Sequence, residues 1–317
     1  MAAFLACPAN VVAQAEGSRP DRTQRVKYLN DAKRILFLGD SITAAGGYVV
    51  DFETWHVKRR DPGQLPVLNM GLASETVSGL SEEGHAGGQF PRPDLFERLE
   101  RMLDTAKPDL VFACYGMNCG IYQPFDEDRF EKYRVGITLL KKTVEKDGAK
   151  LILITPPFYD SLKHSDKDFY DGVLSKYTDW LNERAAKDGW LVIDLHTAMA
   201  HEVAERRKTD PKFTFAGDGV HPNADGHWFI ATRIFQWFGD DDSANAKTPQ
   251  EMMKLWSVPN DVRTAVAARS ATLRDAYVAA AGHKRPGVAK GLPIPEAEAK
   301  VAPQTKLIRD KLGVEAM

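Results

Sequence analysis

The sequence has few cysteines, no long apolar run and no excess of either charge, and each shortage excludes a class of protein. Its 317 residues include three cysteines, Cys7, Cys114 and Cys119. Their spacing does not match a zinc site, and Cys114 and Cys119 are interpreted as small buried hydrophobic residues rather than a disulfide. No run of about 18 apolar residues exists, so no membrane-spanning helix is predicted. The 42 basic and 44 acidic residues leave a net charge of −2, which gives no electrostatic basis for binding nucleic acid.

The first 15 residues form an apolar segment that ends in Ala13-Gln14-Ala15. An apolar core followed by small residues is typical of a secretory signal peptide, although the positively charged start of such a signal is missing here. Residues 1–15 are therefore predicted to be a signal peptide or its remnant, on a secreted or periplasmic protein. A disordered apolar tail on a cytoplasmic protein is the alternative. Residues 16–33 are polar and are expected to form a linker or a surface helix.

Short apolar runs alternate with segments of helical period between residues 34 and 240. The run Leu151–Ile154 does not alternate with polar residues, which indicates a strand buried on both faces. Such strands, each followed by a helix, predict a parallel sheet between two layers of helices. The expected strands are residues 34–39, 66–70, 109–115, 150–155 and 190–194.

Residues 241–317 have a different composition, rich in Ala, Lys, Arg and Glu. Helical stretches are expected near 261–281 and 295–314, and no pattern indicates a strand. This part is predicted to be a helical extension that packs on the core.

The first strand ends abruptly in Gly39-Asp40-Ser41, and a helix is expected from Ser41 to the region of Trp55. A buried parallel strand in this arrangement delivers a serine to the carboxyl edge of the sheet, where active sites of open α/β sheets lie. Ser41 can then act as a nucleophile if a histidine and an acid reach it. The tripeptide alone also fits a simple helix N-cap.

The late segment Asp218-Gly219-Val220-His221 offers both of the groups that such a serine needs. An acid three residues before a histidine, in a loop containing glycine, can curl back to orient the imidazole. Two further strand ends carry polar or small residues, Gly71 and Asn118. A glycine lets a backbone N–H approach a ligand closely, and an asparagine side chain can donate to an oxyanion.

Together these four segments resemble the SGNH hydrolases, also called the GDSL esterase/lipase superfamily. The resemblance is carried by Gly39-Asp40-Ser41, Gly71, Gly116-Met117-Asn118 and Asp218-Gly219-Val220-His221, in the order of the family. It implies a flavodoxin-like three-layer α/β/α sandwich with a five-stranded parallel sheet. It also implies Ser41 as nucleophile, His221 as general base and acid, and Asp218 as its orienting acid. The oxyanion hole would consist of the N–H groups of Ser41 and Gly71 and the side chain of Asn118. Cys119 stands where many relatives have aspartate.

The expected activity is that of a serine esterase without metal or organic cofactor. Its substrate would be a small-molecule or glycan ester. Deacetylation of O-acetylated carbohydrate is favoured, because relatives with a secretory start and a soluble core often remove acetyl groups from carbohydrates. Short-chain acyl esters, thioesters and lipase-like substrates remain alternatives, as does a binding module that has lost turnover. Weaker candidates for substrate contact are His85, Tyr115 and Tyr122. Asp194 and His196 could instead join Asp40, Asp218 and His221 in a metal-dependent phosphoesterase.

Overall fold

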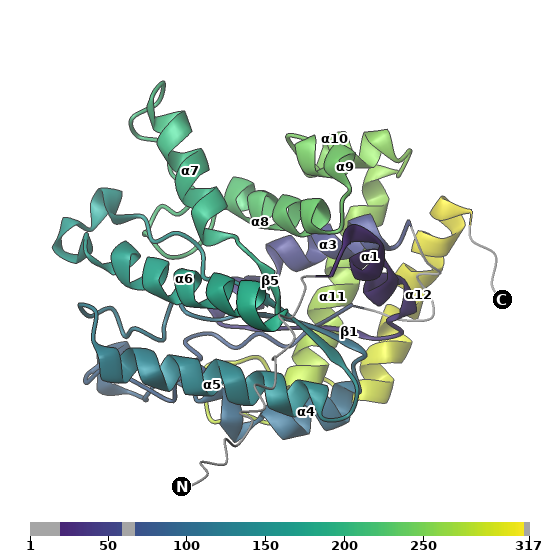
Figure 1. Cartoon of the computed structure of the whole chain (residues 1–317). Helices are drawn as coiled ribbons and strands as arrows, with labels where there is room; N and C mark the ends of the chain where they lie inside the picture. The colour runs from purple at the N-terminus through teal and green to yellow at the C-terminus, as the bar shows by residue number, and fades with distance from the viewer. Residues whose placement is uncertain (1–19, 59–66, 314–317) are drawn as a thin grey trace, which may run out of the picture.

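The computed structural model describes residues 20–58 and 67–313, so the predicted signal peptide lies outside the described residues. A central sheet runs through the molecule, with α4 (Leu99–Ala106) and α5 (Glu127–Glu145) on one side and α3 (Gly47–His56) and α8 (Ala224–Trp237) on the other (Figure 1). Among the described helices, none is long and apolar enough to cross a membrane.

The sheet has five parallel strands in the order β2-β1-β3-β4-β5. This order is that of the flavodoxin-like fold, and it confirms the predicted fold class. Each strand lies within a predicted run. The bounds are Ile35–Gly39 for β1, Val67–Asn69 for β2, Leu110–Cys114 for β3, Lys150–Ile154 for β4 and Leu191–Ile193 for β5. β1 and β3 are buried along their whole length, which explains why neither alternates in polarity.

Helices connect the strands and return the chain to the amino edge of the sheet. The helix expected after Ser41 is divided at Gly46, whose φ of 82° ends α2 (Ser41–Ala45) before α3 begins. Asn223 caps α8 by accepting from the Gly226 N–H at 2.9 Å. The remaining helices of this part are α6 (Tyr170–Asp188), α7 (His196–Arg207) and the short η1 (His85–Gly88), η2 (Leu95–Glu97), η3 (Ser161–Lys163) and η4 (Ser165–Lys167).

Two helical regions flank the core at the ends of the described chain. The range 16–33, expected to be a linker or a surface helix, contains α1 (Arg22–Asp31), which Asp21 caps by accepting from the Gln24 N–H. The C-terminal extension consists of α9 (Asp241–Asn245), α10 (Pro249–Leu255), α11 (Asn260–Ala281) and α12 (Ile294–Leu312). It packs on the core as predicted, since α11 contacts α3, α4 and β2. Because β2 is an edge strand, α11 shields strand groups that could otherwise pair with another chain.

A buried ion pair joins this extension to the core. Arg269 of α11 donates from Nη2 to Glu53 Oε1 of α3 at 2.7 Å, and both side chains are at most 2% exposed. Replacing Arg269 by methionine is expected to lower the free energy of unfolding by about 3–5 kcal/mol, because Glu53 is left buried without its cation. Urea unfolding measures the change.

The control for Arg269→Met is Lys306→Met, because Lys306 pairs with Asp310 at 2.5 Å on the exposed surface of α12. An exposed pair contributes at most about 1 kcal/mol. Equal, small effects of both substitutions would contradict a structural role for the Glu53–Arg269 pair.

Candidate active site

Ser41 is the first residue of α2, directly beyond the carboxyl end of β1. Asp40 forms the turn, because its Oδ1 accepts from the Ile42 N–H at 2.9 Å and caps the helix. Gly39 is required by close packing: a Cβ there would lie 2.8 Å from the Cys114 carbonyl oxygen on β3. The bend thus brings the Ser41 N–H to a helix start, where partial positive charge favours an anion.

His221 bridges Ser41 and Asp218 in the predicted catalytic order. Its Nε2 lies 2.8 Å from Ser41 Oγ, and its Nδ1 lies 2.7 Å from Asp218 Oδ2. An ionised carboxylate only accepts hydrogen bonds, so Nδ1 carries the proton and Nε2 is the acceptor for the serine hydroxyl. Residues 180 positions apart in the chain therefore form a connected serine–histidine–aspartate arrangement.

The orienting acid remains ionised because its own loop surrounds it with donors. Partial burial by itself would raise the pKa of Asp218, but several hydrogen bonds outweigh it and lower that pKa to about 2. Asp218 Oδ1 accepts from the backbone N–H of His221 at 2.8 Å and of Val220 at 3.0 Å. The negative charge that holds the imidazole is thus present throughout the neutral range.

A second set of contacts fixes this loop against the neighbouring elements. The Asp160 N–H donates to the Gly219 carbonyl at 3.0 Å. The Asp160 carboxylate accepts two bonds from Arg207 Nη2 of α7, at 2.8 and 2.6 Å, and one from the Thr214 hydroxyl at 2.5 Å. Sequence reasoning missed Asp160, because an aspartate just before a turn has no pattern that indicates such partners.

Asn118 lies at the carboxyl end of β3, beside the end of β1, with Gly39 paired to Cys114. Its side chain is buried, and its Nδ2 donates to the Glu75 carbonyl at 3.3 Å. The described residues thus offer one acceptor for an amide nitrogen that carries two hydrogens. The other hydrogen can serve an oxyanion.

Gly71 has a different environment from the one expected. Its N–H donates to Asn69 Oδ1 at 3.0 Å, so the structure engages this donor with a side chain. A Cβ at Gly71 would lie 2.6 Å from the Ala44 nitrogen, which means that the glycine permits close packing against α2. Farther along this loop, Ser74 has a left-handed φ of 68°, directly before Glu75, whose carbonyl contacts Asn118. A serine gives no sequence signal for that conformation, so its N–H was not considered.

The three weaker candidates lie in three different environments. His85 is the first residue of η1, and its Nδ1 lies 3.2 Å from Glu82 Oε1. Tyr115 is buried, and its hydroxyl donates to Glu75 Oε2 at 2.6 Å. Tyr122 is partly buried, and its hydroxyl donates to Asn118 Oδ1 at 3.2 Å. Of the three, Tyr122 is therefore the one that hydrogen-bonds to Asn118, a side chain of the predicted oxyanion hole.

Glu75 is the centre of a buried ionic cluster that the sequence did not reveal. Arg98 donates to both of its carboxylate oxygens, at 2.6 and 2.9 Å, and to the Met70 carbonyl at 2.8 Å. Both charged side chains are fully buried. The cluster ties the loop after β2 to the end of β3, and so it supports the backbone around Asn118.

Asp194 and His196, the remaining members of the alternative metal site, have partners other than Asp40, Asp218 and His221. Asp194 accepts from Asn182 Nδ2 at 2.7 Å, and His196 lies 3.7 Å from Asp171 Oδ2. No group of three metal-ligating side chains is found among residues 20–58 and 67–313. The predicted interpretation of Cys114 and Cys119 is confirmed, since both are buried and free.

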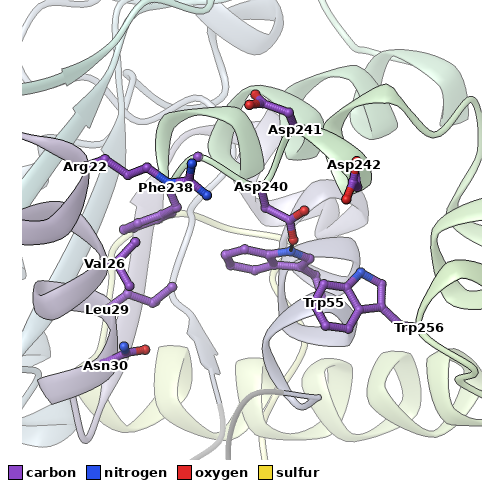
Figure 2. Close-up of a pocket in the computed structure, with 11 residues that line it drawn as sticks. Arg22, Val26, Leu29, Asn30, Trp55, Phe238, Asp240, Asp241, Asp242 and Trp256 are labelled. Carbon is purple, nitrogen blue, oxygen red and sulfur yellow. Dashed lines mark hydrogen bonds between the residues drawn. The ribbon is translucent and has the colours of Figure 1, made fainter.

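A cavity of about 460 Å³ lies elsewhere in the molecule, between α1, the end of α3 and α9 (Figure 2). Trp55 donates from Nε1 to Asp240 Oδ2 at 2.7 Å, and Trp256 donates to the Ser243 hydroxyl at 2.7 Å. Its lining residues on α1 precede β1, whereas Ser41 follows β1. The cavity therefore lies towards the amino edge of the sheet, away from the triad.

The ionisation of Asp40 makes the stability of the protein depend on pH, because Asp40 is a buried carboxyl group. Burial raises its pKa from 3.8 to about 6, although the Ile42 N–H partly offsets this effect. The contribution of Asp40 to stability is therefore complete below pH 3.8 and is lost as pH rises through about 6. The difference between the two pKa values corresponds to about 3 kcal/mol.

Asp40→Asn is therefore expected to remove about 2 kcal/mol of the change in unfolding free energy between pH 4 and pH 7, an interval that holds most of the full effect. Asparagine keeps an oxygen for the Ile42 N–H but does not ionise. Urea unfolding of both proteins at the two pH values measures the difference, with the exposed Asp225→Asn as control. An unchanged pH dependence in Asp40→Asn would show that Asp40 does not titrate in this range.

The comparisons with known proteins agree with this geometry. A family model described as the GDSL-like lipase/acylhydrolase family matches residues 37–229, more than half of the chain. The chain therefore belongs to the GDSL-like lipase/acylhydrolase family, and this membership supports a carboxylic ester hydrolase. No curated protein sequence matches it.

Solved structures share the fold at low identity. One is a gut microbial diltiazem-metabolizing enzyme with 20% identity and a TM-score of 0.52, where the match covers 71% of this chain and 49% of that one. Another is a catalytic mutant of an acetylxylan esterase from Geobacillus stearothermophilus, with 22% identity and a TM-score of 0.50. That match covers 65% of this chain and 94% of the esterase. This chain thus matches about half the length of the first and nearly all of the second.

Proposed function

We propose that the protein is a serine esterase that removes acetyl groups from O-acetylated carbohydrate through an acyl-enzyme intermediate. The observation that carries the proposal is the connected set of contacts from Asp218 through His221 to Ser41, at 2.7 and 2.8 Å. A serine hydroxyl is a weak nucleophile unless a base accepts its proton, and this arrangement supplies that base.

In the first half of the reaction, Ser41 Oγ attacks the acetyl carbon while its proton passes to His221 Nε2. The carbonyl oxygen becomes an oxyanion, which the Ser41 N–H and Asn118 Nδ2 stabilise. The imidazolium then gives its proton to the sugar oxygen as the carbon–oxygen bond breaks. The sugar leaves and acetyl-Ser41 remains.

In the second half, water attacks the acetyl carbon while His221 takes one of its protons. The second tetrahedral intermediate collapses, His221 returns the proton to Ser41 Oγ, and acetate departs. Asp218 orients the imidazole in both halves and stabilises its positive charge.

A carbohydrate ester fits the openness of the site. The side chains of His221 and Asp218 are 51% and 54% exposed, so a bulky alcohol part can extend into solvent beyond the triad. The acetylxylan esterase that shares the fold supports the same substrate class. Short-chain acyl esters and thioesters use the same chemistry, and the assay must therefore separate them.

The test has two stages. Labelling with a fluorophosphonate, followed by peptide mapping, should place the label on Ser41, and its absence would contradict the serine mechanism and leave a binding module. Acetate release is then measured on acetylated xylan, other acetylated glycans, p-nitrophenyl esters and an acyl thioester. Turnover of simple esters or thioesters without any acetylated glycan would contradict the proposed substrate class.

A further inference from the structure

The Asn118 side chain is held at both of its ends. Its Nδ2 donates to the Glu75 carbonyl at 3.3 Å, and its Oδ1 accepts from the Tyr122 hydroxyl at 3.2 Å. Asn118 is 4% exposed, so water has little access to replace either contact. The amide is thus fixed by one loop on each side of it.

The two contacts are both satisfied in one of the two amide orientations. An asparagine amide has nearly the same shape when its oxygen and nitrogen exchange places, so packing alone distinguishes them poorly. In the exchanged orientation, Oδ1 would face the Glu75 carbonyl oxygen, and the amide hydrogens would face the Tyr122 hydroxyl. That orientation would also present an oxygen to the oxyanion, which is repulsive. The Glu75 carbonyl, which can only accept, therefore selects the orientation that catalysis requires, and the Tyr122 hydroxyl holds the amide in it by donating to Oδ1.

Tyr122 is well placed to act as a constant donor. Its ring stacks on Tyr170 at 4.7 Å, and the Tyr170 hydroxyl donates to the Met117 carbonyl at 2.7 Å. Burial raises the pKa of Tyr122, so its hydroxyl stays protonated over the working range of an esterase. The aromatic pair thus connects Tyr122 to the segment that carries Asn118.

The backbone supports this position at a cost. Ile121 and Tyr122 have left-handed φ values of 47° and 55°. Such a conformation costs about 1–3 kcal/mol for each residue that is not glycine, and it persists where the surroundings impose it. The turn that follows Asn118 therefore brings Tyr122 back onto the asparagine that precedes it by four residues.

We infer that Tyr122 is a positioning residue: its hydroxyl holds the Asn118 amide with the nitrogen available to the oxyanion. The inference rests on the proposed function, because it requires Asn118 to act as an oxyanion donor. It gives Tyr122 a role different from the substrate contact that the sequence suggested.

A double-mutant cycle tests the inference, with kcat and KM measured for p-nitrophenyl acetate. Asn118→Ala is expected to lower kcat by about 10²–10³-fold, as for loss of one oxyanion donor. Tyr122→Phe should lower kcat roughly tenfold with KM unchanged, within the range of one hydrogen bond. In the Asn118→Ala background, Tyr122→Phe should cause no further loss, because its effect passes through the amide.

The matched control is Tyr133→Phe, which removes a buried hydroxyl that donates to the Tyr115 carbonyl at 3.3 Å but does not contact Asn118. Its kcat should remain that of the wild type. The rate of inactivation by a fluorophosphonate is a second measurement, since the phosphoryl oxygen occupies the oxyanion hole. It should fall in parallel with kcat for Tyr122→Phe, while the thermal unfolding midpoint identifies any loss of fold.

Three outcomes would overturn the inference: an unchanged kcat in Tyr122→Phe, a change confined to KM, or the same loss with and without Asn118. A change confined to KM would return Tyr122 to substrate binding. Each of these leaves the serine mechanism intact. Failure of the proposed function would appear separately, as full activity in Ser41→Ala.

Discussion

Ser41→Ala is expected to lower kcat for p-nitrophenyl acetate by about 10⁴–10⁶-fold, because the group that forms the acyl-enzyme is removed. The oxyanion donors and substrate binding remain, so a small residual rate over water is expected. The fold should be unchanged, since the capping oxygen of α2 belongs to Asp40 and not to Ser41. Steady-state kinetics and circular dichroism measure the two effects.

Ser78→Ala is a suitable control for Ser41→Ala. The Ser78 hydroxyl lies 3.5 Å from the Cys119 carbonyl, in the loop beyond β2, and it has no contact with His221. Its kcat should be close to that of the wild type. Substantial activity in Ser41→Ala would mean that another nucleophile, or water activated directly by His221, performs the reaction.

Asp218→Asn is expected to lower kcat by about 10⁴-fold, because it changes which imidazole nitrogen carries the proton. Asparagine can keep an oxygen for the N–H groups of Val220 and His221, so the loop geometry should survive. Its nitrogen then faces His221 Nδ1 as a donor. Nδ1 must accept, Nε2 becomes protonated, and the histidine can no longer take the Ser41 proton.

The pH profile of the remaining activity provides a further check on Asp218. Because the pKa of Asp218 is about 2, the wild-type carboxylate stays ionised throughout an assay between pH 5 and pH 9, and no pH in this range should mimic the variant. Asp194→Asn is the control, since Asp194 bonds to Asn182 and lies outside the triad. A loss in Asp194→Asn comparable with that in Asp218→Asn would instead favour the alternative metal site.

The core of the fold was predictable because its strands are buried on both faces. Runs such as Leu151–Ile154 carry that burial in the sequence, and all five strands lie within the predicted ranges. The extension was predictable as helical for a similar reason, since α11 and α12 follow the expected stretches closely. Its location on the β2 edge was not, because the Glu53–Arg269 pair joins residues 216 positions apart.

The triad was predictable because its chemistry is concentrated in two short segments. Ser41 follows an apolar strand directly, and Asp218 and His221 share one loop. The environment of Gly71 was harder to predict from the sequence. A glycine after a strand can expose its N–H or permit close packing. The Gly71 N–H bonds to Asn69 Oδ1 at 3.0 Å, and the Asn69 side chain is itself held by α2, because its Nδ2 donates to the Thr43 carbonyl at 2.7 Å.

The sequence by itself determined the parallel sheet, the helical extension and the three side chains of the serine–histidine–aspartate arrangement, because burial and local spacing express each of them. Only the tertiary structure decided which donors and acceptors surround them. Three features depend on side-chain directions and on segments distant in the chain. They are the contacts of Asn118 with Tyr122 and Glu75, the Arg98–Glu75 cluster, and the packing of α11 over β2. Tertiary packing determines these side-chain directions and brings the distant segments together, and no local sequence pattern predicts that packing.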